Sequence, residues 1–352
     1  MNKYLSLACV SLAALSLLGC GGGSAASTPP PTVVVTPPPP PLQSSDLPAP
    51  PAPPAGDDFH PEGKGWVRVW SDEFDGDSLD PAKWEKEVAC WGGGNDERQC
   101  YTDRDRNVEV INGLLRLVAY PEVFTGPEFG QERADRGRQI TQQYTSGKVR
   151  TRGLADWKYG RFEARIKLPT GQGTWPAFWM LPADDVYGGW PLSGEIDIME
   201  TVNLGAACSV CEGSAIENRS SGTLHFGSAF PNNTFKGDEN PLPGTFDDYF
   251  VFAAEWGEGQ INWFVNGELF QTQTDEDWFT DSVSKDENPN APFDQSFYLM
   301  LNYAVGGNYP ENTNEITFAP ESFPSQLLID WVRVYQCEFD GTAGTACMQD
   351  PI

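Results

Sequence analysis

Histidine and basic side chains are scarce in this sequence of 352 residues. Only His60 and His225 are present, which leaves few candidates for a histidine-rich zinc site or a Ser-His-Asp triad. Lysine and arginine number 23 against 50 aspartates and glutamates, a formal net charge of −27. Such an acidic chain repels phosphate backbones, so we expect no nucleic-acid partner.

The N-terminal apolar stretch is too short to cross a membrane as a helix. It runs over residues 5–18, fourteen residues, against the roughly 20 that a spanning helix needs. With Lys3 before it, this stretch predicts a signal peptide over residues 1–19. The Leu17-Leu18-Gly19-Cys20 segment resembles a bacterial lipoprotein processing site, which implies a lipid on Cys20; an ordinary signal peptide is the alternative.

We therefore expect an exported protein that is anchored to the bacterial outer membrane or cell surface through this lipid only. Residues 20–58 are rich in proline, which favours an extended linker. Because composition does not change again before residue 340, we predict one domain over residues 59–340 and a C-terminal tail over 341–352.

Long helical periodicity is also missing from the domain. Short runs in which polar and apolar residues alternate recur instead, and 36 glycines and 30 prolines supply turns. These runs are residues 161–168, 250–256, 261–265, 268–270 and 327–335. The pattern predicts an all-β sandwich of two antiparallel sheets, large enough for a concave substrate cleft.

Six of the eight cysteines remain once export removes Cys9 and lipid occupies Cys20. An oxidising compartment favours disulfides among them. Spacing suggests Cys90 with Cys100 and Cys337 with Cys347, which leaves Cys208 and Cys211. Six cysteines allow fifteen connectivities, and a zinc site at Cys208 and Cys211 is the alternative.

The segment Glu-Ile-Asp-Ile-Met-Glu at residues 195–200 is the main candidate for chemistry. On a regular strand Glu195 and Asp197 share one face, and a β-bulge near residues 198–199 would bring Glu200 to the same face. Crowded carboxylates resist joint ionisation, so such a cluster is unfavourable for the fold, and acid catalysis on sugars would explain its presence. A solvated acidic strand or a calcium site are the alternatives to catalysis.

Strand geometry makes a retaining glycosidase feasible. Glu195 and Glu200 would be about four strand steps apart, roughly 13 Å between Cα atoms. Inward-leaning side chains would leave the carboxyls near the roughly 5–5.5 Å of a retaining pair. Glu195 would then be the nucleophile, Asp197 would share a proton with Glu195, and Glu200 would be the acid/base.

Aromatic residues before this segment add a second signal. Alternation places Trp175 and Trp179 on one strand face and Phe178 on the other. Indoles that face a groove offer flat apolar surfaces to sugars, whereas burial in the core is the alternative. Trp190 is a candidate groove wall, and His225 lies in another alternating run.

The sequence resembles glycoside hydrolase family 16, in its bacterial laminarinase branch. The resemblance rests on the bulged segment at 195–200 and on the segments at 95–99, 101–103, 144–150, 175–182 and 302–307, and it extends over residues 66–336. Cys100 departs from the family pattern, which puts its loop in doubt. An insertion between Asn203 and Gly222 carries Cys208 and Cys211, and we expect it to shape one end of the cleft.

The resemblance implies a β-jelly roll that hydrolyses internal β-1,3-glucosidic bonds of β-glucan with retention. It implies catalytic roles for Glu195, Asp197 and Glu200, no cofactor for catalysis, and a monomer. Six further positions match residues that hold glucose units: Asn95, Arg150, Trp175, Trp179, Trp190 and His225. A structural calcium is implied at Glu73, the backbone of Gly113, and Asp330.

Three alternatives stay open at this stage. The same fold acts on mixed-linkage β-glucan or red-algal galactan, and the bulged segment does not separate these substrates. A surface glycan-binding protein without catalysis is a second alternative, although it would not need two crowded acids. A structural adhesion module would explain the linker but not the acids.

Overall fold

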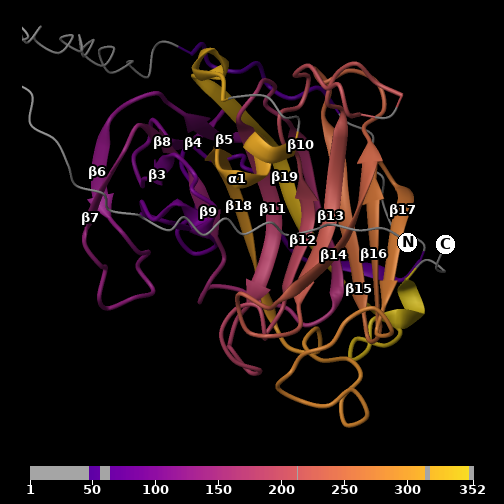
Figure 1. The fold of residues 1–352 in the computed structure, drawn as a ribbon. Coiled ribbons are helices and arrows are strands. Elements are labelled where there is room, and N and C mark those ends of the chain that lie inside the picture. The colour runs from indigo at the N-terminus through magenta and orange to yellow at the C-terminus, as the bar shows by residue number, and fades with distance from the viewer. Residues whose placement is uncertain (1–46, 56–63, 212, 314–317, 349–352) are drawn as a thin grey trace, which may run out of the picture. The chain divides into compact units, whose positions relative to one another are not determined.

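The computed structural model describes residues 47–55, 64–211, 213–313 and 318–348. These residues form a β-jelly roll, in which two antiparallel sheets pack face to face (Figure 1). The predicted all-β sandwich is confirmed. The predicted signal peptide, Cys20 and most of the predicted linker lie outside the described residues.

The larger sheet has eight strands, with β1 paired to β19 outside the main order. Across the sheet they are β17 (Glu268–Thr274), β16 (Gln260–Val265), β15 (Phe250–Gly257), β10 (Gly160–Lys167), β19 (Ser325–Cys337), β5 (Leu114–Ala119) and β4 (Val108–Ile111), with β1 at Trp66–Asp72. The alternating runs of the sequence become β10, β15, β16, β17 and β19, so these strand predictions are confirmed.

The second sheet has seven strands and carries the acidic segment. Their order is β14 (Thr234–Pro241), β13 (Arg219–Phe226), β12 (Glu195–Glu200), β11 (Thr174–Pro182), β18 (Phe297–Val305), β9 (Lys148–Arg150) and β2 (Glu85–Lys86). Figure 1 shows β11 to β14 side by side at its centre. The face of this sheet that points away from the core is called the site face below.

Short elements complete the fold. They are the parallel pair β3 (Gln99–Tyr101) and β8 (Tyr144–Ser146), the antiparallel pair β6 (Phe124–Pro127) and β7 (Gln139–Gln142), helix α1 (Asn308–Thr313), and the 3-10 turns Gly92–Gly94, Pro320–Ser322 and Thr345–Cys347. Within the described ranges, no helix has the length and apolar character needed to span a membrane.

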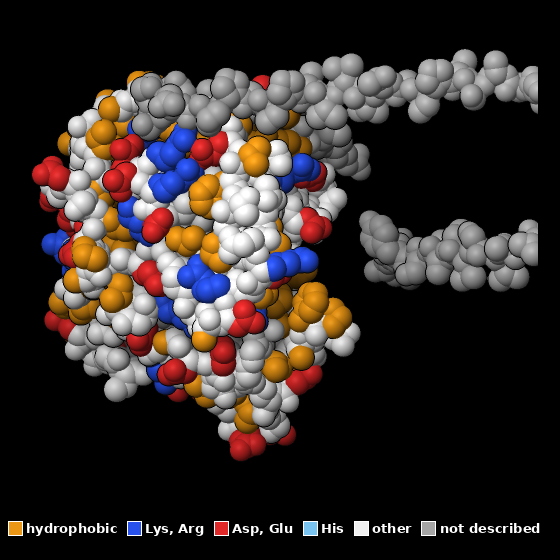
Figure 2. Space-filling view, turned by 90° about the vertical axis from the view of Figure 1, so that its left-hand side faces the viewer, with side chains coloured by type: hydrophobic (Ala, Val, Ile, Leu, Met, Phe, Trp, Pro, Cys, Tyr) orange, Lys and Arg blue, Asp and Glu red, His pale blue; other side chains and the backbone are white. Residues whose placement is uncertain are grey.

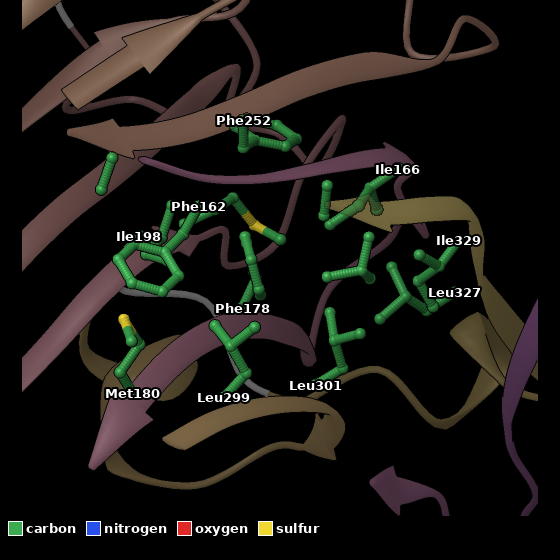
Figure 3. Close-up of a cluster of buried hydrophobic side chains, with 14 of the residues drawn as sticks. Phe162, Ile166, Phe178, Met180, Ile198, Phe252, Leu299, Leu301, Leu327 and Ile329 are labelled. Atoms are coloured by element: carbon green, nitrogen blue, oxygen red, sulfur yellow. The ribbon is translucent and has the colours of Figure 1, made fainter. Parts of the chain in front are cut away.

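One hydrophobic core lies between the two sheets (Figure 3). Phe162 on β10 and Ile329 on β19 come from the larger sheet, and Phe178 on β11 and Leu299 on β18 come from the second. All four side chains are fully buried. Because apolar residues alternate along these strands, the opposite faces remain free for polar side chains.

The polar face of β10 is more buried than its alternating pattern predicts. We expected a half-buried strand, but Arg161, Glu163 and Arg165 are all buried. Arg161 donates hydrogen bonds to Glu163 and Glu255, so the charges are paired where water is excluded. The alternating pattern predicted the strand but not the burial of its polar face.

Part of the predicted linker packs against the domain. The carbonyl of Pro50 accepts a hydrogen bond from Asn112 Nδ2 at 2.8 Å, and that of Pro54 accepts one from Arg165 at 3.0 Å. In the predicted tail, the carbonyl of Ala343 accepts a bond from the backbone N–H of Glu258 at 2.7 Å. Contacts with the domain therefore extend beyond residues 59–340.

All three expected disulfides are present. Cys90 is bonded to Cys100, Cys208 to Cys211, and Cys337 to Cys347. Because Cys208 and Cys211 are bonded to each other, the zinc alternative at these two residues is wrong. On the face drawn in Figure 2, basic side chains are interspersed with acidic ones, although the whole chain carries a net charge of −27.

Candidate active site

A β-bulge in β12 brings the acidic side chains to the site face. On β11, Phe178 and Trp179 are consecutive, but they pair with Met199 and Asp197, so Ile198 is the extra residue. The register with β13 shifts at the same point. The bulge expected near residues 198–199 is thus present. Ile196, Ile198 and Met199 are buried in the core, which leaves the site face to the carboxylates.

Trp263 of β16 supports the bulge from inside the core. Its indole Nε1 donates a 2.8 Å hydrogen bond to the backbone carbonyl of Asp197. The ring lies where Gly222, opposite the bulge on β13, has no side chain: a Cβ there would stand 2.3 Å from the indole Cδ1. Glycine at position 222 is therefore required for the indole to reach the bulge.

Glu195, Asp197 and His225 form a compact charged cluster. His225 Nε2 lies 3.3 Å from Asp197 Oδ2 and 3.7 Å from Glu195 Oε1. His225 is opposite Glu195 in the register between β12 and β13, so both side chains point to the site face. Trp190 Nε1 donates a 2.7 Å hydrogen bond to Glu195 Oε2. Glu195 therefore has a cation and an N–H donor beside it.

Glu200 has a different environment. Trp175 Nε1 donates a 2.8 Å hydrogen bond to Glu200 Oε1, and the Trp175 ring packs edge-on against Tyr309 at 5.4 Å. Ser221 is the strand neighbour of Glu200. Trp175 is 8% exposed and packs with Val202 and Ala304, so it orients Glu200 more than it forms an open groove wall.

The electrostatics of the cluster favour retained protons on the two glutamates. Burial, followed by the negative charge of Asp197, raises the pKa of Glu195 and that of Glu200 to about 8. Burial by itself would lower the pKa of His225. Its hydrogen bond to Asp197 and the charge of Glu195 outweigh burial and raise that pKa to about 10. His225 is therefore a cation at neutral pH, and Glu195, Glu200 and His225 titrate as a set.

Trp179 is held by a chain of buried hydrogen bonds. Its Nε1 donates to Asn302 Oδ1 at 2.6 Å, and Asn302 Nδ2 donates to the Tyr101 hydroxyl at 3.0 Å. The Tyr101 hydroxyl in turn donates to Glu97 at 3.5 Å, and burial raises the pKa of Glu97. Lys148 Nζ lies 4.9 Å from the Trp179 ring centre. The indole is thus fixed in orientation.

The structure does not offer Arg150 to a substrate. Its side chain is 3% exposed, and its nitrogens donate to Glu85, Glu87 and Glu132 at 2.7, 2.7 and 2.9 Å. We expected a glucose-binding residue from the resemblance. Three carboxylates accept the hydrogen bonds of the guanidinium instead, which makes Arg150 a structural residue beside the site.

Asn95 lies in the loop before β3 and is exposed. Its side chain hydrogen-bonds Glu97, and its carbonyl accepts a 2.7 Å bond from the backbone N–H of Asn308 at the start of α1. Its predicted contact with sugar stays a prediction.

The insertion after β12 comes close to Glu200. A small pocket is lined by Glu200, Glu217, Arg219 and Tyr309, among others. Glu217 Oε2 is 3.3 Å from Cys211 Sγ, and Arg219 pairs with Glu217 at 2.7 Å. Glu217 of the insertion thus lines the pocket at Glu200, and the role of the insertion in shaping one end of the cleft stays a prediction.

Among the residues that the structure describes, two clusters have enough ligand atoms for a metal ion. In the first, Cys208, Cys211 and Glu217, the thiols are consumed by the disulfide. In the second, Glu195, Asp197 and His225, a metal would require a neutral imidazole. The raised pKa of His225 favours the protonated ring, so this cluster fits an ion pair better than a metal site.

The two carboxylates expected to bind calcium together with the backbone of Gly113 do not fit that ion. Both oxygens of Glu73 accept hydrogen bonds from Arg333, at 3.0 and 2.8 Å, and Arg68 approaches Glu73 at 3.3 Å. Asp330 forms an ion pair with Arg165. Guanidinium groups already neutralise both carboxylates, and their positive charge would repel Ca²⁺.

Several residues that build the site were missed by sequence reasoning. Trp263, Gly222, Tyr309 and Tyr101 act across strands that are distant in the chain. Asn302 had a usable signal, because in the alternating β18 it stands opposite Ala177 on the site face between Trp175 and Trp179. Tyr101 lies in one of the segments that carry the family resemblance, whereas Trp263, Gly222 and Tyr309 carried no local signal.

Comparison with known proteins agrees with this geometry. A family model described as "Beta-porphyranase A-D, GH16 domain" matches residues 66–337. Glucan endo-1,3-beta-glucosidase A1 of Niallia circulans is 41% identical over 283 residues, which cover 77% of this chain and 38% of that protein. Beta-glucanase of Rhodothermus marinus is 38% identical over 292 residues, 80% of this chain and 89% of that protein.

A solved structure shows the same fold. The X-ray structure of the laminarinase from Rhodothermus marinus superposes with a TM-score of 0.62 and 38% identity, covering 77% of this chain and 97% of that one. The chain thus spans just over a third of the Niallia circulans protein but most of the two Rhodothermus marinus chains.

The hydrogen bond from Trp263 to the bulge can be tested by Trp263→Phe. Loss of the indole N–H should cost about 1–3 kcal/mol of unfolding free energy and lower kcat on β-glucan by about tenfold or more, because the carboxyls shift. Denaturant unfolding and reducing-end assays measure the two effects.

Trp256→Phe is the matched control, because buried Trp256 on β15 donates its N–H to the Phe293 carbonyl at 3.0 Å, away from the bulge. It should lose similar stability and keep its kcat. Equal kcat losses in both variants would contradict a specific role for Trp263.

Proposed function

The chain belongs to glycoside hydrolase family 16, and on this basis we propose that it hydrolyses internal β-1,3-glucosidic bonds of laminarin-type β-glucan with retention of configuration. The observation that carries the proposal is the bulged strand β12, on which Glu195 and Glu200 share one face but have different partners. Two carboxyls in distinct environments are what an acid and a nucleophile need.

Glu195 is the nucleophile in this proposal. Of the two glutamates with raised pKa values, Glu195 loses its proton first. The His225 cation is 3.7 Å away, and Trp190 donates a hydrogen bond to the Glu195 carboxylate. Its ionised oxygen attacks the anomeric carbon and forms a glycosyl-enzyme. Asp197 keeps His225 protonated through their 3.3 Å contact.

Glu200 is the acid and then the base. The negative charges of Asp197 and Glu195 hold its proton, so it can protonate the leaving glycosidic oxygen. Once Glu195 is esterified by the sugar, its charge is gone and the pKa of Glu200 falls. Glu200 can then accept a proton from the water that releases the product.

A β-1,3-glucan substrate is supported by the names of the relatives, and a galactan is the second candidate because the matching family model is described for porphyranases. A sulfated galactan would need a free cation at the site. The His225 cation is paired with Asp197 and Glu195, and other basic side chains on this sheet are paired as well: Lys148 with Glu87 at 3.4 Å, Arg150 with three glutamates, and Arg219 with Glu217. A neutral glucan suits this site better.

We also propose that the chain is exported and is anchored by a lipid on Cys20. The apolar stretch with its Cys20 supports this, and three disulfides suit an oxidising compartment. A Cys20→Ala variant, expressed in a bacterial host, should move from the membrane fraction to the soluble fraction. If both forms are equally soluble, there is no lipid anchor.

Activity on laminarin, lichenan, agarose and porphyran tests the substrate and the nucleophile together. We expect laminarin to be cut and the first-formed reducing ends to be β, as seen by NMR. Glu195→Gln should lower kcat by about 10³-fold or more, because removal of a nucleophile eliminates the covalent step. The exposed Glu268→Gln is the matched control and should have full activity.

Cleavage of agarose or porphyran with laminarin untouched would overturn the substrate. First-formed α ends would overturn retention. A wild-type chain that binds laminarin without cutting it would favour a glycan-binding protein.

The pH profile tests the electrostatics. Activity should fall as pH rises through about 8, where Glu200 loses its proton. Asp197→Asn removes a negative charge that raises the pKa of Glu200, so the alkaline limb of kcat/KM should move to lower pH. The fully exposed Asp105→Asn should leave it in place. An alkaline limb that does not move in Asp197→Asn would show that Asp197 does not hold this proton.

A further inference from the structure

Beside Trp190, which binds Glu195, lie two exposed aromatic side chains that the proposed chemistry does not use. Phe230 and Phe235 expose 70% and 68% of their surface, and Trp190 exposes 44%. Phe226, next to His225 in the chain, is by contrast 2% exposed and packs in the core. Large apolar side chains that remain this exposed together point to a ligand.

Phe235 ends a row of side chains that begins at Glu195. Glu195 on β12 is opposite His225 on β13, and His225 is opposite Phe235 on β14. Directly opposite residues point to the same face of a sheet, and the rings of His225 and Phe235 lie 5.7 Å apart. Since β14 is the last strand of the sheet, Phe235 lies two strand spacings, about 10 Å, from the strand of Glu195.

Phe230 joins the same group from the connection between β13 and β14. Its ring centre is 6.1 Å from that of Trp190, and the Trp190 ring is 6.1 Å from His225. Neighbouring rings in the group are inclined by 35–41°. The four rings thus form one continuous series from Phe230 to Phe235, and it includes the indole that is hydrogen-bonded to Glu195.

The position of this surface argues for a sugar as its occupant. An edge strand normally carries charge or proline, because exposed apolar residues there promote aggregation. Flat aromatic faces match the C–H faces of pyranose rings, and they need no charged group on the ligand. A polysaccharide chain that is held at Glu195 would also extend past it in at least one direction.

We propose that Phe230 and Phe235 extend Trp190 into an aromatic platform that binds glucose units of the β-glucan chain beyond the unit held at Glu195. This inference rests on the proposed function, because the occupant is the same polysaccharide. It assigns a binding role to two residues that take no part in bond cleavage.

Kinetics of the full chain with the double variant Phe230→Ala/Phe235→Ala test the platform. KM for long laminarin should rise about tenfold, from the loss of two stacking contacts, while kcat stays within about twofold. Hydrolysis of a short β-1,3-oligosaccharide that reaches only the units next to Glu195 should be unchanged. The products from laminarin should also shift in length, which a general loss of stability would not cause.

Three single variants separate stacking from simple burial. Phe235→Trp keeps a flat ring and should keep the low KM, whereas Phe235→Leu keeps an apolar side chain without a ring and should lose it. Phe339→Ala is the matched control, because Phe339 is 67% exposed but lies near Gly65 and Cys347 rather than at the site. It should behave like the unmodified chain.

The outcomes distinguish this inference from the proposed function. If the unmodified chain cuts laminarin but the double variant keeps its KM and products, the platform is wrong and the function stands. If the chain cuts only another polysaccharide, the function is wrong, and the variants are measured on that substrate instead. A dimer in sedimentation that the double variant abolishes would assign the surface to a second copy and overturn the proposal.

Discussion

The site depends on one hydrogen bond between the two sheets, from the indole of Trp263 to the carbonyl of Asp197. A bulge leaves backbone groups outside the regular ladder, and a buried carbonyl without a donor is unfavourable. Trp263 provides this donor from β16, and Gly222 leaves room for its ring. Without that support the extra residue in β12 would be costly, and Glu200 would point into the core rather than beside Glu195.

The second constraint is electrostatic, because the bulge places three acids on one face. The molecule limits the repulsion in two ways. His225 supplies a positive charge between Glu195 and Asp197, and indole N–H groups from Trp190 and Trp175 bind one glutamate each. Burial, followed by the remaining repulsion from Asp197, raises the pKa of Glu200, which is the property that an acid catalyst needs.

Acidic side chains away from the site are also paired with positive charges. In a chain with 50 acidic residues, arginines hold carboxylates in pairs: Arg333 with Glu73, Arg165 with Asp330, and Arg150 with three glutamates. These contacts pair with arginine the two carboxylates that the resemblance assigned to calcium, and they bind the guanidinium that it assigned to a glucose unit. The exposed aromatic surface of Trp190, Phe230 and Phe235 carries no charge on these three side chains, which suits a neutral polysaccharide.

The sequence alone determined the strands, the bulge and the three acids of β12, because alternation and spacing are local properties of the chain. It also indicated the three disulfides. Only the tertiary structure decided how each candidate is used. Arg150, Glu73 and Asp330 were matched by position, but each has a partner that is distant in the chain: Glu87 is 63 residues from Arg150, Arg333 is 260 from Glu73, and Arg165 is 165 from Asp330. Local patterns carry no information on such contacts, and a charged side chain takes its role from the charges packed around it.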